Sequence, residues 1–143
     1  MSISDYIAYP VSYTSCADGG YIVTVHGIDD CMTEGKDLQD AENMGRSAII
    51  DMANAYFKDR DLFPSAPKAN DSESVIKLSY DTAIKFFIRN LMKVERVTAS
   101  EIARRLKVTP QNIQKKLDLY KTTKIDFLAE ILEALGKKLT ISC

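Results

Sequence analysis

Residues 98–117 read TASEIARRLKVTPQNIQKKL, and this stretch predicts two short helices joined by a tight turn. Thr98 and Glu101 have the spacing of a capping box, in which each side chain accepts a hydrogen bond from a backbone N–H group at a helix start. Thr109 predicts a second start, because its hydroxyl can cap a helix and Pro110 needs no donor at the first helical position. The stretch therefore predicts a helix–turn–helix unit.

The second helix of this unit has one apolar and one polar face. Ile113 and Leu117 lie one turn apart and are expected to be buried. Amide and amine side chains occupy the other positions, from which such groups can reach base edges in a DNA major groove. These side chains are Gln111, Asn112, Gln114 and Lys115. The pattern is that of phage Cro repressors and predicts binding to duplex DNA.

Two capped helices also occur in ordinary helical bundles, so the distribution of charge matters. Residues 80–143 contain thirteen Lys and Arg against seven Asp and Glu, a net charge of +6. Residues 1–79 contain six against thirteen, a net charge of −7. A basic domain gains affinity from DNA phosphates, whereas an acidic one is repelled by them. We therefore expect two domains, 1–79 and 80–143, with different partners.

Other residues of the basic half are expected to contact phosphates or to cap the helix that faces them. They are Thr109, Lys116, Lys121 and Lys124. The turn has Lys107 where this motif usually has Gly, and a Lys with a left-handed backbone costs about 1 kcal/mol. That cost is small enough to leave the interpretation in place.

The geometry of DNA predicts the oligomeric state of the protein. A Cro-type helix binds tightly when a two-fold dimer places two such helices about 34–36 Å apart. The last helix and residues 139–141 offer apolar surface for a dimer, and the edge of an N-terminal sheet offers a second contact. We expect a homodimer, or a dimer of dimers, on operator DNA with dyad symmetry.

The rest of the chain predicts an α+β fold, with a small antiparallel sheet and one long helix before the helix–turn–helix domain. The expected strands are 7–14, 21–25, 31–34 and 75–78, the fourth joining the same sheet. The expected helices are 37 to 57–62, 82–94 and 123–135. Pro10 removes a donor from the first strand, which predicts an edge position or a bulge. Residues 63–74, FPSAPKANDSES, predict a linker or loop.

Helical spacing also predicts which side chains are buried. On the long helix they are Leu38, Ala41, Gly45, Ala48, Ile49, Met52 and Tyr56. On the next they are Ala83, Phe87, Asn90 or Leu91, and Val94. On the last they are Ile125, Leu128, Leu132 and Leu135, with Thr123 beginning the helix and Gly136 as its C-cap. Residues 139–142 either add a terminal strand or fray.

Composition narrows the class of protein. No apolar run approaches the roughly 18 residues that span a bilayer. The first ten residues, MSISDYIAYP, contain neither the basic nor the apolar region of a secretory signal. Cys16, Cys31 and Cys143 are widely spaced and accompany a single His, which fits neither a disulfide framework nor a zinc site. We expect free thiols in a cytoplasmic protein.

The order of several short motifs resembles the HicB antitoxin family over nearly the whole chain. The N-terminal motifs are Tyr9-Pro10-Val11, Asp18-Gly19-Gly20-Tyr21-Ile22-Val23, Thr33-Glu34-Gly35, and Asp37 leading to Asp40-Ala41. The C-terminal motifs are IKLSYDTAIKFFIRNLM at 76–92, EIARRL at 101–106, Thr123-Lys124-Ile125-Asp126, and Ala134-Leu135-Gly136-Lys137-Lys138-Leu139. The chain departs from the family at Asp29-Asp30, where Pro-Gly is frequent, and at Gly45 within the long helix.

The resemblance implies a partial ribonuclease-H-like N-terminal domain, without a working active site, that binds and inhibits a small HicA-type toxin. That toxin is a basic ribonuclease of double-stranded-RNA-binding-like fold with a catalytic His, and the acidic N-terminal half suits such a partner. Asp18, Asp29 and Asp30 are the expected electrostatic guides. In this family the C-terminal domain represses the toxin–antitoxin operon. Because some members carry a ribbon-helix-helix domain instead, the helix–turn–helix prediction depends on the residues of this chain.

No catalytic or metal site is expected. Metal-dependent hydrolysis needs converging carboxylates, and nothing in the spacing of Asp5, Asp18, Asp29, Asp30 and Asp51 predicts convergence. His26 has no Cys or Ser partner in evident register, so it receives no role, and no cofactor is implied. The main alternative is a one-component transcriptional regulator whose N-terminal domain senses a ligand or dimerises. An active nuclease fused to a DNA-binding domain is a third class.

Overall fold

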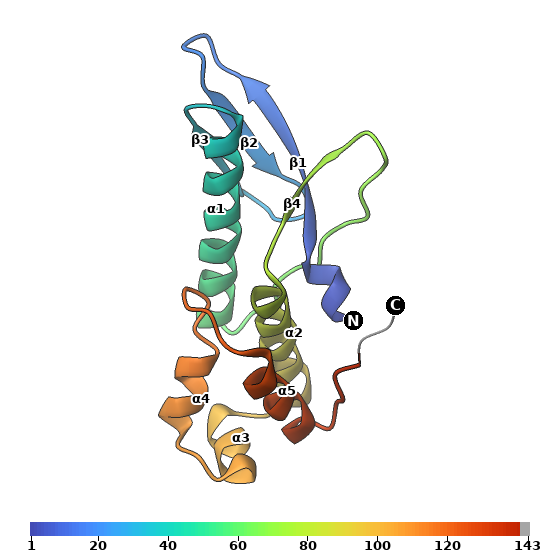
Figure 1. Cartoon of the computed structure of the whole chain (residues 1–143), viewed down its shortest axis with the longest axis vertical. Coiled ribbons are helices and arrows are strands. Elements are labelled where there is room, and N and C mark those ends of the chain that lie inside the picture. The colour runs from blue at the N-terminus through green and yellow to red at the C-terminus, as the bar shows by residue number, and fades with distance from the viewer. Residues whose placement is uncertain (141–143) are drawn as a thin grey trace.

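A four-stranded antiparallel sheet forms the N-terminal half of the computed structural model, which describes residues 1–140 (Figure 1). A 3-10 helix, η1 (Ile3–Tyr6), precedes the strands β1 (Ala8–Ser15), β2 (Tyr21–Val25), β3 (Met32–Gly35) and β4 (Ser74–Lys77). The strand order is β3-β2-β1-β4. The four predicted strands are therefore confirmed, and β4 joins the sheet beside β1 as expected.

One long helix, α1 (Leu38–Lys58), covers one face of the sheet. It begins where predicted, because the Asp37 carboxylate accepts a hydrogen bond from the Asp40 N–H at 2.8 Å. Gly45 lies on the sheet-facing side, where a Cβ atom would come within 2.6 Å of Cδ1 of Ile76. The glycine that weakens the helix thus allows it to approach the sheet closely.

Pro10 lies in an interior strand, so the prediction of an edge or a bulge is wrong. Its carbonyl accepts a hydrogen bond from the His26 N–H at 2.9 Å and therefore faces β2. The register of β1 with β2 starts one residue later, at Val11 opposite Val25. The N–H and C=O groups of one strand residue point toward the same neighbouring strand. The N–H group that Pro10 lacks would therefore point toward β2, beyond the last residue pair of the β1–β2 ladder.

Four helices form the C-terminal half, and together with the sheet they confirm the α+β class. They are α2 (Tyr80–Glu95), α3 (Ala99–Leu106), α4 (Pro110–Lys116) and α5 (Ile125–Ala134). Helix α2 is central, since it contacts η1 on one side and α5 on another (Figure 1). Buried apolar residues of the two halves belong to one hydrophobic cluster. The expected division at residue 79 stays a prediction.

The expected linker before β4 is a loop fixed against α2. Phe63 is 2% exposed, and Asn90 holds its backbone on both sides. The Asn90 amide accepts from the Phe63 N–H and donates to the Phe63 carbonyl, each at 2.9 Å, and it also donates to the Tyr6 hydroxyl. Both of the alternatives left open, Asn90 and Leu91, are buried.

Some predictions of burial at helix ends are wrong. Leu38, Val94 and Ile125 are 51%, 57% and 45% exposed, because each lies in the first or last turn of its helix, at the surface. Thr123 does not cap α5, which has Lys124 as its N-cap. Gly136 has the left-handed φ of 79° expected of the glycine that ends a helix.

The remaining predictions concern thiols, membranes and the C-terminus. Cys16 and Cys31 are free, and burial raises the pKa of the Cys31 thiol to about 11. Within residues 1–140, no helix has both the length and the apolar character needed to span a membrane. Residues 137–140 form no regular element, while the predictions for Ile141, Ser142 and Cys143 lie outside the described residues.

Candidate functional site

Helices α3 and α4 form the predicted helix–turn–helix unit, and both threonines act as caps. The Thr98 hydroxyl accepts from the Glu101 N–H at 3.2 Å, and the Thr109 hydroxyl accepts from the Asn112 N–H at 3.1 Å. Glu101 does not complete a capping box, because its carboxylate binds the guanidinium groups of Arg104 and Arg105 instead. The hydrogen bond from Arg104 is the main reason that the pKa of Glu101 is lowered.

The turn between these helices has the backbone conformation expected at Lys107. Its φ of 59° is left-handed, and the next N–H, of Val108, donates to the Ala103 carbonyl at 3.0 Å. A lysine there costs about 1 kcal/mol relative to glycine. The turn thus forms without glycine, and α4 follows α3 after three residues.

Helix α4 separates buried and exposed side chains much as predicted. Ile113 is buried, while Gln111, Gln114 and Lys115 are exposed. Asn112 is half-buried, and its Oδ1 atom is buried without a hydrogen-bond partner among the described residues. The accessible polar surface of the helix therefore consists mainly of two amides and one amine.

The four residues predicted to contact phosphates differ in their exposure and in their contacts with the rest of the chain. Thr109, Lys121 and Lys124 are exposed around α4. Lys116 is half-buried, and its ammonium group lies 5.0 Å from the centre of the Phe127 ring. A cation held over an aromatic ring is partly committed to that contact, so Lys116 is a weaker candidate than the other two lysines.

A buried lysine, missed by the sequence analysis, fixes the chain that follows α4. Lys85 on α2 is 0% exposed, and its ammonium group donates to the carbonyls of Asp118, at 2.9 Å, and Lys121. It also pairs with Asp81 at 3.4 Å, and Asp81 accepts from the Thr123 N–H at 3.2 Å. Only the spacing of Asp81 and Lys85 was visible in the sequence, and it suggests an ordinary exposed pair.

The pKa values of this pair reflect burial and mutual contact. Burial lowers the pKa of Lys85, although the charge of Asp81 opposes this change. Burial would raise the pKa of Asp81, but hydrogen bonds from Ser79 and Thr123 and the charge of Lys85 together lower it. The carboxylate and the ammonium group therefore form a hydrogen-bonded ion pair that anchors residues 118–123 to the first turns of α2.

The same segment contacts the N-terminal half. The Tyr120 hydroxyl donates to the Asp51 carboxylate of α1 at 2.7 Å, and this hydrogen bond raises the pKa of Tyr120 to about 12. Asp51, considered earlier only as a surface acid, thus links α1 to the loop after α4. The sequence carries no signal for this contact, because the two residues are 69 positions apart.

The three acids expected to guide the toxin are exposed but do not lie together. Asp18 lies in the turn before β2, whereas Asp29 and Asp30 lie in the loop after it. The length of β2 therefore separates them, as the hairpin turn and the β2–β3 loop in Figure 1 show. They cannot act as one cluster on a single small surface.

Asp18 does join two acids that the sequence analysis missed. A hollow of about 460 Å³, here called the acidic hollow, is lined by Asp18, Glu34 and Asp40 together with Lys36. Asp40 is partly occupied, since it accepts from the Lys36 N–H at 2.8 Å. Glu34 is exposed on β3. The acidic hollow lies beside the exposed β1–β2 turn.

Comparison with known proteins identifies the family. The family model described as a HicB-like antitoxin of bacterial toxin–antitoxin systems matches residues 8–87. The chain belongs to the HicB-like antitoxin family. Antitoxin HicB of Escherichia coli (strain K12) is 30% identical over 133 residues, 93% of this chain and 96% of that protein. Antitoxin HicB 2 of Photorhabdus laumondii subsp. laumondii is 31% identical over 139 residues, 97% of this chain and 98% of that protein.

HicB-like antitoxins are not enzymes. A row of three hydrogen-bonded side chains in this antitoxin, Ser12, His26 and Glu73, therefore has a structural role. The Ser12 hydroxyl lies 2.8 Å from Nε2 of His26, and Nδ1 of His26 lies 3.2 Å from the Glu73 carboxylate. The sequence shows no Ser partner for His26 in evident register, and the fold supplies one, Ser12 of β1. Glu73 also accepts from the Asn70 N–H at 3.1 Å, so the row fastens the loop before β4 to the hairpin.

Metal ligands are not gathered in this HicB-like antitoxin, as far as residues 1–140 are concerned. Nowhere in that part of the chain do three or more His, Cys, Asp or Glu side chains lie where they could hold an ion. The acids weighed as nuclease ligands serve other contacts or lie apart, such as Asp51 with Tyr120 and Asp5 with the Ser2 N–H.

Proposed function

We propose that this HicB-like antitoxin neutralises a HicA-type ribonuclease that cleaves mRNA, and that it represses its own operon by binding operator DNA. The match of residues 8–87 to antitoxins of toxin–antitoxin systems supports the first part. The second part rests on one observation: α4, capped by Thr109, buries Ile113 and exposes Gln111, Gln114 and Lys115. Side chains of these types can read base edges in the major groove.

For the DNA complex, we propose that α4 enters the major groove of each half-site. Gln111, Gln114 and Lys115 contact bases, with Asn112 in a lesser role because it is half-buried. Phosphates are contacted by Thr109, Lys121 and Lys124, and less strongly by Lys116. A homodimer, alone or as a dimer of dimers, places two copies of α4 on an operator with dyad symmetry.

For the toxin complex, we propose that charge brings the partners together. The N-terminal half has a net charge of −7, and a basic ribonuclease is attracted to it. The first contacts are Asp18 and Glu34 at the acidic hollow on one end of the sheet, and Asp29 and Asp30 at the other end. Bound antitoxin then covers the toxin surface that would receive RNA.

The DNA part is tested by measuring affinity for operator and for unrelated duplex DNA at several salt concentrations. Gln111→Ala and Lys115→Ala should each cost about 1–3 kcal/mol on the operator and much less on unrelated DNA. Lys121→Ala should weaken binding to both and reduce the salt slope by about 1. Lys68→Ala, which removes an exposed charge from the loop before β4, is the control. Unchanged operator binding by the first two variants together would discard the assignment.

The toxin part is tested with full-length antitoxin and the ribonuclease encoded beside it, using cleavage of mRNA as the readout. Glu34→Gln should slow association and weaken its salt dependence more than it speeds dissociation. Asp71→Asn removes an exposed acid outside the acidic hollow and should leave both rates unchanged. A toxin that stays fully active in excess antitoxin would instead favour a ligand-sensing regulator.

A further inference from the structure

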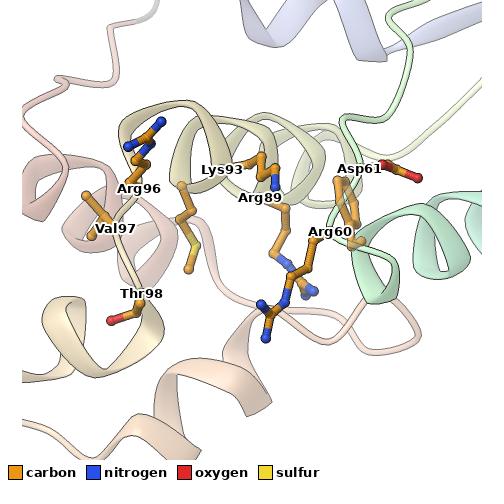
Figure 2. Close-up of a pocket in the computed structure, with 9 residues that line it drawn as sticks. Arg60, Asp61, Arg89, Lys93, Arg96, Val97 and Thr98 are labelled. Carbon is orange, nitrogen blue, oxygen red and sulfur yellow. The ribbon is translucent and has the colours of Figure 1, made fainter.

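A second hollow, of about 480 Å³, lies where the end of α1 and the last turns of α2 meet the start of α3 (Figure 2). We name it the arginine hollow. Apolar side chains of Phe57, Met92 and Val97 form part of its lining. The charged lining consists of Arg60, Arg89, Lys93 and Arg96, against the single carboxylate of Asp61. Four cationic residues thus line this hollow in a chain whose total net charge is −1.

None of these four cations forms an ion pair with another described residue. The ion pairs found in residues 1–140 involve His26, Arg46, Lys85, Arg104, Arg105 and Lys137. Arg89 is half-buried, and its guanidinium group lies 5.0 Å from the centre of the Phe57 ring. Burial lowers the pKa of Arg89. A guanidinium group withdrawn from water without an anion is unfavourable, and a bound anion would remove that cost.

Two of these arginines also have a strained backbone conformation. Arg60 and Arg96 have φ values of 60° and 56°, and each ends a helix at a position where glycine is usual. The Asp61 N–H reaches the Tyr56 carbonyl and the Val97 N–H reaches the Met92 carbonyl, both at 2.9 Å. An arginine at such a position is strained relative to glycine, because its Cβ atom crowds the neighbouring backbone. Of the four non-glycine residues with positive φ in residues 1–140, two, Arg60 and Arg96, line this hollow.

The side chains of Arg60 and Arg89 converge in a way that suits an anion, whereas the guanidinium group of Arg96 extends away from them (Figure 2). Figure 2 shows the guanidinium groups of Arg60 and Arg89 extending in the same direction, while the Asp61 carboxylate points away from them. Their five N–H donors in a planar fork match the oxygen atoms of a phosphate group. The apolar part of the lining excludes water from one side of the hollow, which strengthens such a contact.

We propose that the arginine hollow binds a phosphate group carried by a nucleic acid backbone or by a free polyphosphate. Thr98 lies in the lining and caps α3, the helix that crosses the DNA backbone in helix–turn–helix complexes. A backbone phosphate is therefore one source, and this source rests on the proposed operator binding. The volume of the hollow also falls within the range of small-molecule sites, so a free polyphosphate is the other source.

The experiment is calorimetric titration of the full-length chain with inorganic pyrophosphate at low salt, without DNA or toxin. Saturable binding of one pyrophosphate per chain is expected. Arg60→Asn should weaken it about tenfold, since Asn tolerates a left-handed backbone and removes the charge. Arg89→Lys should also weaken it, because the ammonium group keeps the charge but loses the fork. Lys68→Asn, with the same loss of charge on an exposed loop, should bind like the unchanged chain.

Two further measurements separate the sources and guard against misfolding. Circular dichroism and melting temperature establish that each variant is folded. If duplex DNA displaces pyrophosphate, the occupant is a backbone phosphate, and if both bind together or DNA does not bind, it is a free polyphosphate. Absence of saturable binding, or equal affinities for Lys68→Asn and both arginine variants, overturns the site. That result leaves the toxin and operator proposals intact, because neither partner is present in the titration.

Discussion

At the scale of single residues, Lys85 carries the largest expected penalty for substitution. Lys85→Met keeps the length of the side chain but removes the ammonium group that pairs with the Asp81 carboxylate and donates to the carbonyls of Asp118 and Lys121. Removing one partner of a buried ion pair costs about 3–5 kcal/mol. Urea unfolding should show this loss, whereas Lys124→Met, at an exposed position, should change stability by less than about 0.5 kcal/mol.

The stability of Lys85→Met decides whether the buried ion pair anchors residues 118–123. If Lys85→Met is as stable as the unchanged chain, residues 118–123 hold their conformation without the ion pair, and the anchoring role is wrong. If it is destabilised but folded, operator affinity should fall as well, because Lys121 and Lys124 lie on the segment that loses its anchor. Variants of Lys124 alone cannot produce both effects.

At the scale of elements, the contact between α1 and the sheet depends on Gly45. Gly45→Ala would favour the helix by about 1 kcal/mol but would press a Cβ atom against Cδ1 of Ile76, where overpacking costs about 1–3 kcal/mol. We expect a net loss of stability. In an Ile76→Val background, which lacks that Cδ1 atom, the same substitution should become neutral or stabilising, as a double-mutant cycle by urea unfolding would show. Equal effects in the two backgrounds would contradict the close approach.

The loop after α4 is a second test at this scale. Tyr120→Phe removes the hydroxyl that donates to Asp51 on α1, and little else. Since the hydrogen bond is exposed, global stability should fall by no more than about 1 kcal/mol. Hydrogen exchange of the amides in residues 118–123 should nevertheless become faster, while exchange in the middle of α1 should not change. Tyr80→Phe, another exposed tyrosine, is the matched control.

At the scale of the whole molecule, the two halves share α2, and this governs what a fragment can do. Residues 1–79 lack Phe86 and Asn90, which pack against or hydrogen-bond to Tyr6 and Phe63. We expect that fragment to show no cooperative thermal transition by circular dichroism, whereas the full chain should melt in one transition. A cooperative transition in residues 1–79 would establish an independent domain, ending at the boundary predicted from charge.

The sequence predicted the elements well because their signals are local. Strand alternation, the Asp37 cap and the two threonine caps all act within a few residues, and each appears in the structure. Contacts between distant residues left no such signal. The position of Pro10, the row from Ser12 through His26 and the burial of Lys85 depend on which elements become neighbours.

The candidate DNA-binding and toxin-binding surfaces likewise have some features that are predictable from the sequence and others that depend on the fold. The exposed amides of α4 follow from helical spacing, so they were predictable, whereas the half-burial of Asn112 and Lys116 depends on neighbouring elements and was not. The toxin-facing acids were chosen from exposed turns alone. Their separation by β2, and the approach of Glu34 to Asp18, required the fold of the sheet.

The position of α2 between the two halves has a consequence for the lifetime of this protein in a cell. A protease that cuts once within α2 removes the hydrophobic support of the sheet and of the helix–turn–helix unit together. Under the proposed function, the toxin loses its inhibitor and the promoter loses its repressor in the same event. Fresh transcription of the operon would then begin at the moment when new antitoxin is needed.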